Sequence, residues 1–455
     1  MAIDTKKWIA FVEKHREKIL AAERQIWNHP ETGYREWKTT KYLEEEFEKL
    51  GYTLTKAGNI PGFITDIDTG RPGPKLLIFG EMDSLICLDH PEADKETGSV
   101  HACGHNAQCA ALLGLAAALK EEGALDGLCG SIRLCAVPAE ELLEQEFRED
   151  LVKKGIIRYY GGKVEFMYRG LFDGCDLAFM VHQTSQLNDE LFMINAGSNG
   201  CFTKNVTYHG VSAHAGGNPQ QGINALYAAN LGLNASNSLR ETFPDNDHIR
   251  FHPIITYGGT ATNAIPDTVK LESYVRGASL EAIRRENQKI NRALAASAAA
   301  MGANITISDR AGYMPYMQDQ NMLDVAREAM VAICGSKDKI RDRGTFGTGC
   351  SDIGDICAVM PACHPYAGGA IGRGHGNDYY IQDADKACVN SAKMQLLMLV
   401  MLLSDGAARA KYCIANKKTP FASKEEYFAA VDSVNMDKKA VEYREDGSIV
   451  LNFTK

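Results

Sequence analysis

Apolar runs of strand length, separated by a helical stretch and polar breaks, lie between residues 75 and 183 and constrain the fold most strongly. Three of them are "KLLIFGEMD" (75–83), "SIRLCAVPAEE" (131–141) and "DLAFMVHQ" (176–183), and the Ala- and Leu-rich stretch between the first two predicts a helix over residues 106–122. Continuous apolar strands alternating with helices are typical of a mostly parallel sheet covered on both faces. We therefore predict an α/β fold built on such a sheet.

The chain is long enough for more than one domain. Its 455 residues exceed the roughly 250–300 residues at which a single core usually gives way to several. From about residue 198 half-exposed strands and amphipathic helices follow in the order strand, helix, two strands, helix, strand. This order is typical of a small α+β domain of ferredoxin-like type. We expect residues 198–311 to be an inserted domain, residues 1–197 and 312–407 to form the first domain in two parts, and residues 408–455 to be a C-terminal extension without assigned role.

Charge, hydropathy and cysteine usage exclude several classes of partner. The net charge is −9 without a long basic run, so no nucleic-acid or anionic-membrane surface is expected. No apolar run approaches the roughly 20 residues of a membrane span, and the N-terminal stretch lacks the apolar middle of a secretory signal. The 13 cysteines are scattered without a CxxC pair, which fits free thiols in a reducing compartment. We expect a cytoplasmic protein that binds a small molecule.

Polar side chains end the predicted strands. Asp83 ends the first run, Glu140 and Glu141 end the second, and His182 lies at the end of the third. Ligands bind beyond the carboxyl ends of the strands in such sheets, so these groups are expected to share one rim.

The stretch "HACGHNAQCAALLG" (101–114) lies between two of these strands and adds a thiol and imidazoles to the rim. A helix needs one capping residue, which Asn106 can supply, so Cys103 and His105 are surplus to capping. The two residues are two positions apart and face the same side of an extended loop.

This set of donors predicts a metal centre. A thiolate, imidazoles and carboxylates suit Zn²⁺ best, with Mn²⁺ as the alternative, and more than four candidates indicate two divalent ions. Glu140 and Glu141 are adjacent and point in opposite directions in an extended backbone. One is therefore expected to bind metal and the other to act as general base on a metal-bound water, which predicts hydrolysis.

Several motifs occur in the order seen in one enzyme family. They are "WNHPETGYREWKT", "GEMDSL", "HACGHN", "PAEE", "HGVSAHAGGNPQQGINAL", "GGTATNAIPD", "YVRG", "GCSDIGD" and "GRGHGND". Over about residues 25–385 the chain resembles the two-metal amidohydrolase and carboxypeptidase family, which includes aminoacylase-like enzymes, hippurate hydrolase and plant indoleacetyl-amino acid hydrolases. Within it, the chain most resembles the aminobenzoyl-glutamate hydrolase branch.

The resemblance implies a homodimeric enzyme that hydrolyses the amide bond of N-acyl or N-aroyl amino acids, with the inserted domain serving as lid and dimerisation domain. It makes Glu140 the general base and Asp83 a nearby orienting carboxylate. The metal ligands that it implies are Cys103, His105, Glu141, His182 and His375.

The resemblance also assigns roles in the inserted domain. His214 is similar to the family histidine that reaches across the dimer to stabilise the developing oxyanion. Asn263 and Arg276 resemble the groups that hold the substrate near its carboxylate, a task for which the Arg fork is suited.

The chain departs from the family pattern around the expected site. Asn106 and Gln108 stand where relatives often have Asp and His, so the surroundings of the ligands are expected to carry less charge. The glycines that usually follow the glutamate pair are replaced by "LLEQEF", and a longer "RYYGGKVEFMYRGLFDG" (158–174) follows. These differences are expected to reshape the pocket or to contact a partner subunit.

Three alternative functions remain open. The first is dipeptide or carboxypeptidase hydrolysis by the same fold. The second is a metal-free enzyme in which Cys103 is the nucleophile, activated by His101 or His105. The third is a non-catalytic metal-binding protein, against which Glu140 argues, because a binding site needs no spare base.

Overall fold

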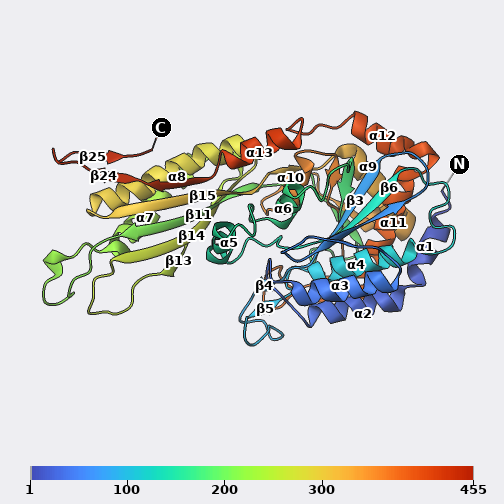
Figure 1. Cartoon of the computed structure of the whole chain (residues 1–455), viewed down its shortest axis with the longest axis horizontal. Helices are drawn as coiled ribbons and strands as arrows, with labels where there is room; N and C mark the ends of the chain where they lie inside the picture. The colour runs from blue at the N-terminus through green and yellow to red at the C-terminus, as the bar shows by residue number, and fades with distance from the viewer. Residues whose placement is uncertain (1–2, 454–455) are drawn as a thin grey trace. The chain divides into compact units, whose positions relative to one another are not determined.

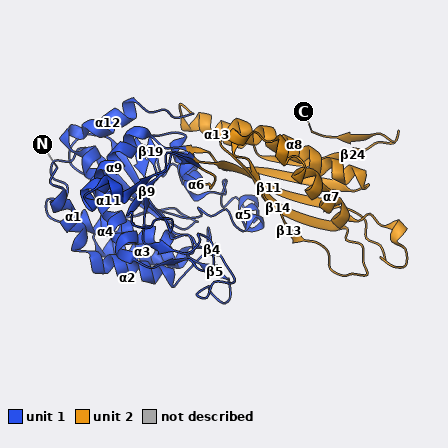
Figure 2. Cartoon of the chain, turned by 180° about the vertical axis from the view of Figure 1, so that it is seen from behind, with its two compact units in different colours: residues 1–197, 317–346, 351–420 blue, residues 198–316, 347–350, 421–455 orange. Residues whose placement is uncertain are grey.

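The computed structural model describes residues 3–453, and the chain divides into two compact units (Figure 2). Unit 1 comprises residues 1–197, 317–346 and 351–420, and unit 2 comprises residues 198–316, 347–350 and 421–455. Unit 2 thus contains the whole segment 198–311 that the sequence predicts as an insertion.

Unit 1 is built on a six-stranded sheet in the order β1-β2-β6-β3-β7-β19 (Figure 1). The pairs β6–β3, β3–β7 and β7–β19 are parallel, whereas β1–β2 and β2–β6 are antiparallel. The strands are β1 (Thr55–Lys56), β2 (Phe63–Asp68), β3 (Lys75–Glu81), β6 (Ser131–Val137), β7 (Leu177–Phe179) and β19 (Ala362–Cys363). The predicted mostly parallel sheet is confirmed, with an antiparallel edge.

Helices cover this sheet and form the core of unit 1. Every residue of α4 is buried, because α4 packs against β3 while α2 and α11 pack against α4. A Cβ on Gly114 of α4 would lie 2.4 Å from the side chain of Ile19 on α2, so the missing side chain permits this close approach. The helices are α1 (Thr5–Glu13), α2 (Arg16–Trp27), α3 (Trp37–Lys49), α4 (His105–Ala118), α5 (Gln145–Lys153), α6 (Gly162–Tyr168), α9 (Gln320–Cys334), α10 (Ile353–Cys357), α11 (Asn390–Leu403) and α12 (Ala408–Ala415).

A second, four-stranded sheet in unit 1 changes one prediction. The run 176–183 does not form one strand, because β7 ends at Phe179 and His182 begins a separate strand, β8, in the other sheet. That sheet has the order β17-β9-β20-β8, with β17 (Ile340–Asp342), β9 (Phe192–Ile194), β20 (Tyr366–Ala367) and β8 (His182–Gln183). Unit 1 also contains two hairpins, β4 (Leu85–Ile86) with β5 (Ser99–Val100), and β21 (Ala370–Ile371) with β22 (Tyr380–Ile381).

Unit 2 is an α+β domain of ferredoxin-like topology. Its antiparallel sheet has the order β12-β14-β11-β15-β23, with β13 also paired to β14, and α7 and α8 pack together and contact the sheet. The stretch 249–259 forms two strands and not one, because Pro253 interrupts it and cannot donate to a strand ladder. The elements are β11 (Gly200–His209), α7 (Ala225–Asn237), β12 (Arg250–Phe251), β13 (Ile254–Tyr257), β14 (Thr268–Gly277), α8 (Leu280–Ala300) and β15 (Asn304–Tyr313).

The segment 408–455 does not form a single extension. Residues up to 420, including α12, belong to unit 1, and residues 421–455 belong to unit 2. There, β23 (Met436–Lys439) pairs antiparallel with β15 and extends the sheet by one strand. The rest of this part contains α13 (Lys424–Asp432), β24 (Val441–Tyr443) and β25 (Ile449–Leu451).

One helical stretch, residues 385–403, is long and apolar enough to cross a membrane by length and composition. In unit 1, 83% of this stretch is buried, and nearly every residue of α11 lies in the core. A helix that is apolar all round is typical of the centre of a large soluble core as well as of a membrane span. Its burial here makes it the core helix of unit 1.

Candidate active site

The carboxyl ends of β3 and β6 bring the predicted acidic residues together in unit 1. Because β3 and β6 are parallel and in register from Lys75 to Glu81, the chain leaves both strands at the same edge of the sheet. Asp83 follows β3, and Glu140 and Glu141 follow β6. All three are buried.

The Cys103–His105 turn is formed by Gly104. Gly104 has φ +95°, a conformation that favours glycine. A Cβ at this position would lie 2.5 Å from the hydroxyl of Tyr379, which donates to the Cys103 carbonyl. Helix α4 begins at His105 with Gly104 in the N-cap position, so the prediction that Asn106 caps the helix is wrong. Asn106 instead lies inside the first turn and donates to Glu23 at 2.8 Å.

Two histidines from other segments lie beside this turn. His182 Nε2 is 3.5 Å from Cys103 Sγ, and its Nδ1 is 2.8 Å from the Gln183 carbonyl oxygen, which leaves Nε2 facing the thiol. His375 Nε2 lies 3.2 Å from Glu141 Oε1. The backbone of His375 has φ 63°, a conformation that is rare outside glycine and is enriched at functional sites.

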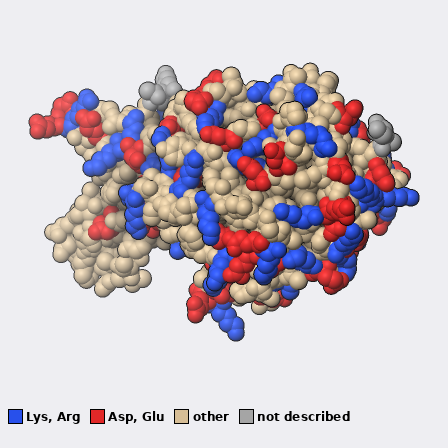
Figure 3. Space-filling model, turned by 45° about the vertical axis from the view of Figure 1, so that its right-hand side comes forward, with Lys and Arg blue, Asp and Glu red and all other residues tan. Residues whose placement is uncertain are grey.

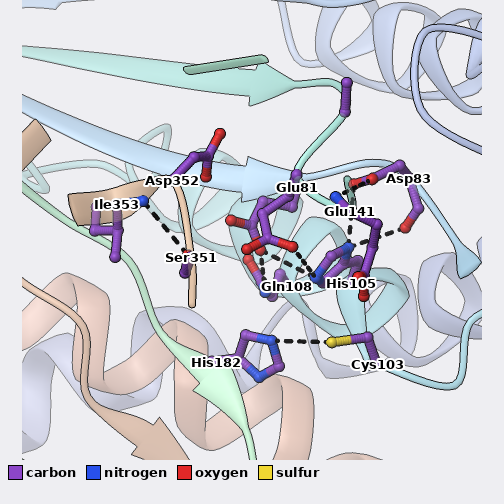
Figure 4. Close-up of polar contacts among 12 residues, drawn as sticks. Glu81, Asp83, Cys103, His105, Gln108, Glu141, His182, Ser351, Asp352 and Ile353 are labelled. Carbon is purple, nitrogen blue, oxygen red and sulfur yellow. Dashed lines mark hydrogen bonds and ion pairs between the residues drawn. The ribbon is translucent and has the colours of Figure 1, made fainter. Parts of the chain in front are cut away.

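The five residues predicted as metal ligands form two donor groups that share Cys103. Within each group the ligand atoms lie within 4.8 Å of one another. The first group is Cys103, His105 and His182, and the second is Cys103, Glu141 and His375. Figure 4 shows the side chains of Cys103, His105, Glu141 and His182 converging. The structure thus offers two sets of ligands, and two ions bound to them would share the Cys103 sulfur atom.

Asp83 connects the two donor groups. His105 Nδ1 lies 3.0 Å from the Asp83 carbonyl oxygen and 3.2 Å from Asp83 Oδ1. The other carboxylate oxygen of Asp83 accepts the Glu141 backbone N–H at 2.7 Å. With Nδ1 engaged in this way, Nε2 of His105 remains available for a metal.

The electrostatics of the site favour bound cations. Burial and Glu141 oppose ionisation of Cys103, but His105 and His182 lower the pKa of its thiol to about 5. Burial also opposes ionisation of Glu141, whose pKa the neighbouring His375 nevertheless lowers to about 2. Glu141 in turn raises the pKa of His375 to about 12. The site therefore holds anionic donors that draw positive charge onto its imidazoles, a place that a divalent cation can take.

Two buried ligand atoms without a hydrogen-bond partner also support bound cations. Among the described residues, His105 Nε2 and Glu141 Oε1 have no hydrogen-bond partner, although each lies 3.2 Å from an ionisable neighbour. Buried polar atoms are normally hydrogen-bonded, and unsatisfied ones call for an explanation such as an ion. The donor set and its geometry fit divalent metal ions.

Comparison with known proteins agrees with this geometry. A sequence model of peptidase family M20/M25/M40 matches residues 77–399. The chain belongs to this family. The predicted family resemblance and fold class are thereby confirmed, as is the prediction of a metal-dependent amidohydrolase or peptidase.

Relatives in peptidase family M20/M25/M40 differ in their named substrates. The Xaa-Arg dipeptidase of Homo sapiens is 26% identical over 375 residues, which are 78% of this chain and 77% of that protein. A chain of the p-aminobenzoyl-glutamate hydrolase of Escherichia coli is 26% identical over 325 residues, covering 69% of this chain and 62% of that protein. A solved dinuclear metal-binding peptidase of Bacillus subtilis has a TM-score of 0.61 at 21% identity, covering 86% of this chain and 99% of that chain, which shows the shared fold.

The structure adds charged residues that the sequence did not reveal as part of this family site. Glu81 ends β3, and its Oε2 lies 3.2 Å from His105 Nε2. The ammonium group of Lys163 contacts both Glu81 and Asp352. Gln108 donates to Glu81 at 2.8 Å. These charged residues lie in the quoted motifs "GEMDSL" and "GCSDIGD" and in the stretch 158–174, and the expectation that the surroundings carry less charge than in relatives stays a prediction.

The turn that carries Glu140 is held by two buried charged side chains, Glu36 and Arg148. Ala139 has φ 59°, and its N–H donates to the buried carboxylate of Glu36 at 2.7 Å. The buried guanidinium of Arg148, on α5, donates to the main-chain carbonyls of Ala139 and Glu141. The guanidinium of Arg148, which follows the "LLEQEF" stretch, thus fixes the backbone on both sides of Glu140.

The three residues predicted to act on substrate belong to unit 2. His214 Nδ1 accepts the backbone N–H groups of Gly216 and Gly217, which leaves the proton on Nε2. The Asn263 carbonyl oxygen accepts the Ala215 N–H at 2.9 Å, so Asn263 lies in the loop beside His214. Arg276 lies on β14, apart from these loops, with its guanidinium 4.1 Å from the Tyr274 ring centroid. Their roles stay predictions.

Proposed function

We propose that this protein hydrolyses the amide bond of N-acyl or N-aroyl amino acids, with Glu140 as general base beside two divalent ions. The observation that carries the proposal is the sharing of Cys103 by two donor groups, with Glu140 adjacent to ligand Glu141. Cys103, His105 and His182 would hold one ion, and Cys103, Glu141 and His375 the other. Thiolate, imidazole and carboxylate donors favour Zn²⁺, with Mn²⁺ as the alternative.

The chain's own residues supply the proton transfers. When bound, the two ions would activate a water molecule and polarise the amide carbonyl. Glu140 is 7% exposed, and burial with neighbouring Glu81 and Glu141 raises its pKa well above the usual value, which favours proton uptake. It would take a proton from the attacking water and give it to the leaving amine nitrogen. Asp83 would keep His105 oriented throughout the reaction.

Substrate class is supported by the named relatives. The similarity to the p-aminobenzoyl-glutamate hydrolase chain supports an aroyl amino acid, whereas the equal identity of the Xaa-Arg dipeptidase supports a dipeptide as the second candidate. Both substrates carry an amide next to a free carboxylate. The family resemblance implies that Asn263 and Arg276, which lie apart within one chain, each help to hold the substrate near its carboxylate, and that His214 donates to the developing oxyanion; we carry these roles over as part of the proposal.

The decisive experiment combines metal analysis with a substrate screen. Purified protein is analysed for metal and then incubated with N-acyl amino acids, N-aroyl amino acids and unblocked dipeptides, with and without chelator. We expect amide cleavage that chelation abolishes and Zn²⁺ or Mn²⁺ restores. Glu140→Gln should keep its metal and lose about 10²–10⁴-fold in kcat. Full activity after exhaustive chelation would instead support the cysteine-nucleophile alternative, and metal binding without turnover the non-catalytic one.

We further infer that two copies of the chain associate through unit 2. β13 lies at the edge of the sheet, and its residues Ile254, Ile255 and Tyr257 are 52%, 45% and 39% exposed. Tyr227 and Leu231, one turn apart on α7, are also exposed. Figure 3 shows the Lys, Arg, Asp and Glu side chains interspersed on the face in view, with a largely uncharged area on the part formed by unit 2.

An exposed apolar sheet edge is a template for pairing with another strand, and here a second copy is the proposed occupant. Light scattering of the purified protein should give a dimer mass. Ile255→Lys should give a monomer with unchanged metal content. A monomeric wild-type protein would contradict this part of the proposal.

A further inference from the structure

Lys163 is the most deeply enclosed cation beside the candidate active site. It lies in the first turn of α6, within the stretch 158–174 that departs from the family pattern, and its side chain is 0% exposed. Its ammonium group contacts Glu81 Oε1 and Asp352 Oδ1, and its backbone N–H donates to Asp352 Oδ2 at 3.0 Å. One lysine therefore joins the end of β3 to the residue preceding α10.

The carboxylates around Lys163 form a cation position of their own. Glu81, Glu140 and Asp352 are buried and can place one oxygen each within 4.8 Å of the others. Buried carboxylates this close repel strongly unless a cation lies among them. Lys163 already contacts two of the three. The chain itself thus supplies the positive charge that this group requires.

Lys163 also fixes the direction of Glu81. The ammonium group engages Oε1, which leaves Oε2 to accept from Gln108 at 2.8 Å and to lie 3.2 Å from His105 Nε2 (Figure 4). Without the ammonium group, Oε1 of Glu81 would lose its cation partner. Glu81 could then bind a metal ion together with Glu140 and Asp352, which would turn Glu140 from a base into a ligand.

We propose that Lys163 is a positioning residue whose ammonium group occupies the third cation position of this site, so that two divalent ions bind and Glu140 does not become a metal ligand. This inference rests on the proposed function, because it presupposes that the two donor groups sharing Cys103 bind ions. The stretch 158–174, for which the sequence predicts a reshaped pocket or a partner contact, would then serve to place Lys163 beside the carboxylates of the site.

The test counts bound ions and measures turnover in matched variants. Metal-free wild type, Lys163→Met and the control Lys204→Met are titrated with Mn²⁺, and bound ions per chain are measured by equilibrium dialysis. Lys204 lies in unit 2, is 1% exposed and contacts Asp309, so Lys204→Met is the same change at an equally buried Lys–Asp pair. Kinetics on the cleaved substrate give kcat and KM separately.

We expect two ions in wild type and Lys204→Met, and a third in Lys163→Met. In Lys163→Met we also expect kcat to fall about 100-fold with little change in KM, because displacing the catalytic base slows the chemical step without weakening substrate binding. The double variant Lys163→Met/Asp352→Asn removes one charge of each sign. It should return to two ions and regain part of the lost kcat.

Results that differ from these expectations would contradict either the role of Lys163 or the proposed function. Two ions and unchanged kcat in Lys163→Met would reduce Lys163 to a structural role and leave the proposed function intact. No bound ion in wild type would overturn the proposed function itself. If Lys163→Met does not fold, a third tightly bound Mn²⁺ in wild type, or in the double variant, still refutes the inference.

Discussion

Arg148→Met removes the guanidinium that holds the backbone around Glu140. In the structure this group donates to the carbonyls of Ala139, Glu141, Leu143 and Tyr160. The carbonyls of Ala139 and Glu141 each also accept one backbone N–H, so they keep a donor in the variant, whereas the Leu143 carbonyl loses the guanidinium. A buried carbonyl that loses its hydrogen-bond donor costs about 1–3 kcal/mol. The variant also no longer pays for burying a charge, which offsets part of this cost. We therefore expect the free energy of unfolding to fall by about 2–3 kcal/mol.

The larger expected effect is on catalysis. A displacement of about 1 Å of a catalytic group costs roughly 100-fold in rate, so kcat of Arg148→Met should fall by about that factor while KM changes little. Steady-state kinetics and denaturant unfolding are measured on the same preparations. Arg133→Met is the matched control, because Arg133 is also buried and donates to the carbonyls of Leu171 and Asp173, but lies four residues before the end of β6. Equal kcat losses in both variants, or none in Arg148→Met, would refute the reasoning.

Three further predictions concern metal binding, pH and packing. Asp83→Asn disturbs the contact that orients His105 and should weaken metal binding about 10–100-fold in a chelator competition assay. Burial opposes ionisation of Asp66, but the ion pair with Arg133 lowers the pKa of Asp66 below its usual value. The pair therefore stabilises the fold at neutral pH, and this stabilisation is lost as the pH falls through the lowered pKa. The destabilisation caused by Asp66→Asn should therefore shrink below about pH 4 in urea unfolding. Gly114→Leu overfills the contact between α2 and α4 and should cost about 1–3 kcal/mol or more in the same assay.

The fold was predictable wherever burial follows a regular period. One of the half-exposed strands expected after residue 198 is β14, Thr268–Gly277, whose residues alternate between buried and half-exposed along the whole strand. The predicted helix over residues 106–122 is α4, His105–Ala118, which begins one residue earlier and ends four residues sooner. Prediction failed where tertiary pairing decides. The strand β23 is short and polar, and only its pairing with β15 makes it part of the sheet.

The candidate ligands were predictable because they cluster in short motifs at strand ends. Cys103 and His105 share one motif, and Glu140 and Glu141 another. His375 was implied only by the family resemblance, since no strand end or helix start marks it. Lys163 gave no local signal, because a lysine in the first turn of a helix normally faces solvent. Its burial depends on Glu81 and Asp352, which lie 82 and 189 residues away in the chain.

The stretch after the glutamate pair has a physical reason to carry two buried cations. Ala139 is held at φ 59°, a conformation that costs roughly 1–3 kcal/mol for a residue with a side chain and persists only when its surroundings enforce it. Arg148 holds the carbonyls of this turn, and Lys163 neutralises the carboxylates that face Glu140. Two buried cations from consecutive helices, Arg148 on α5 and Lys163 on α6, thus constrain the backbone and the charge around the proposed general base.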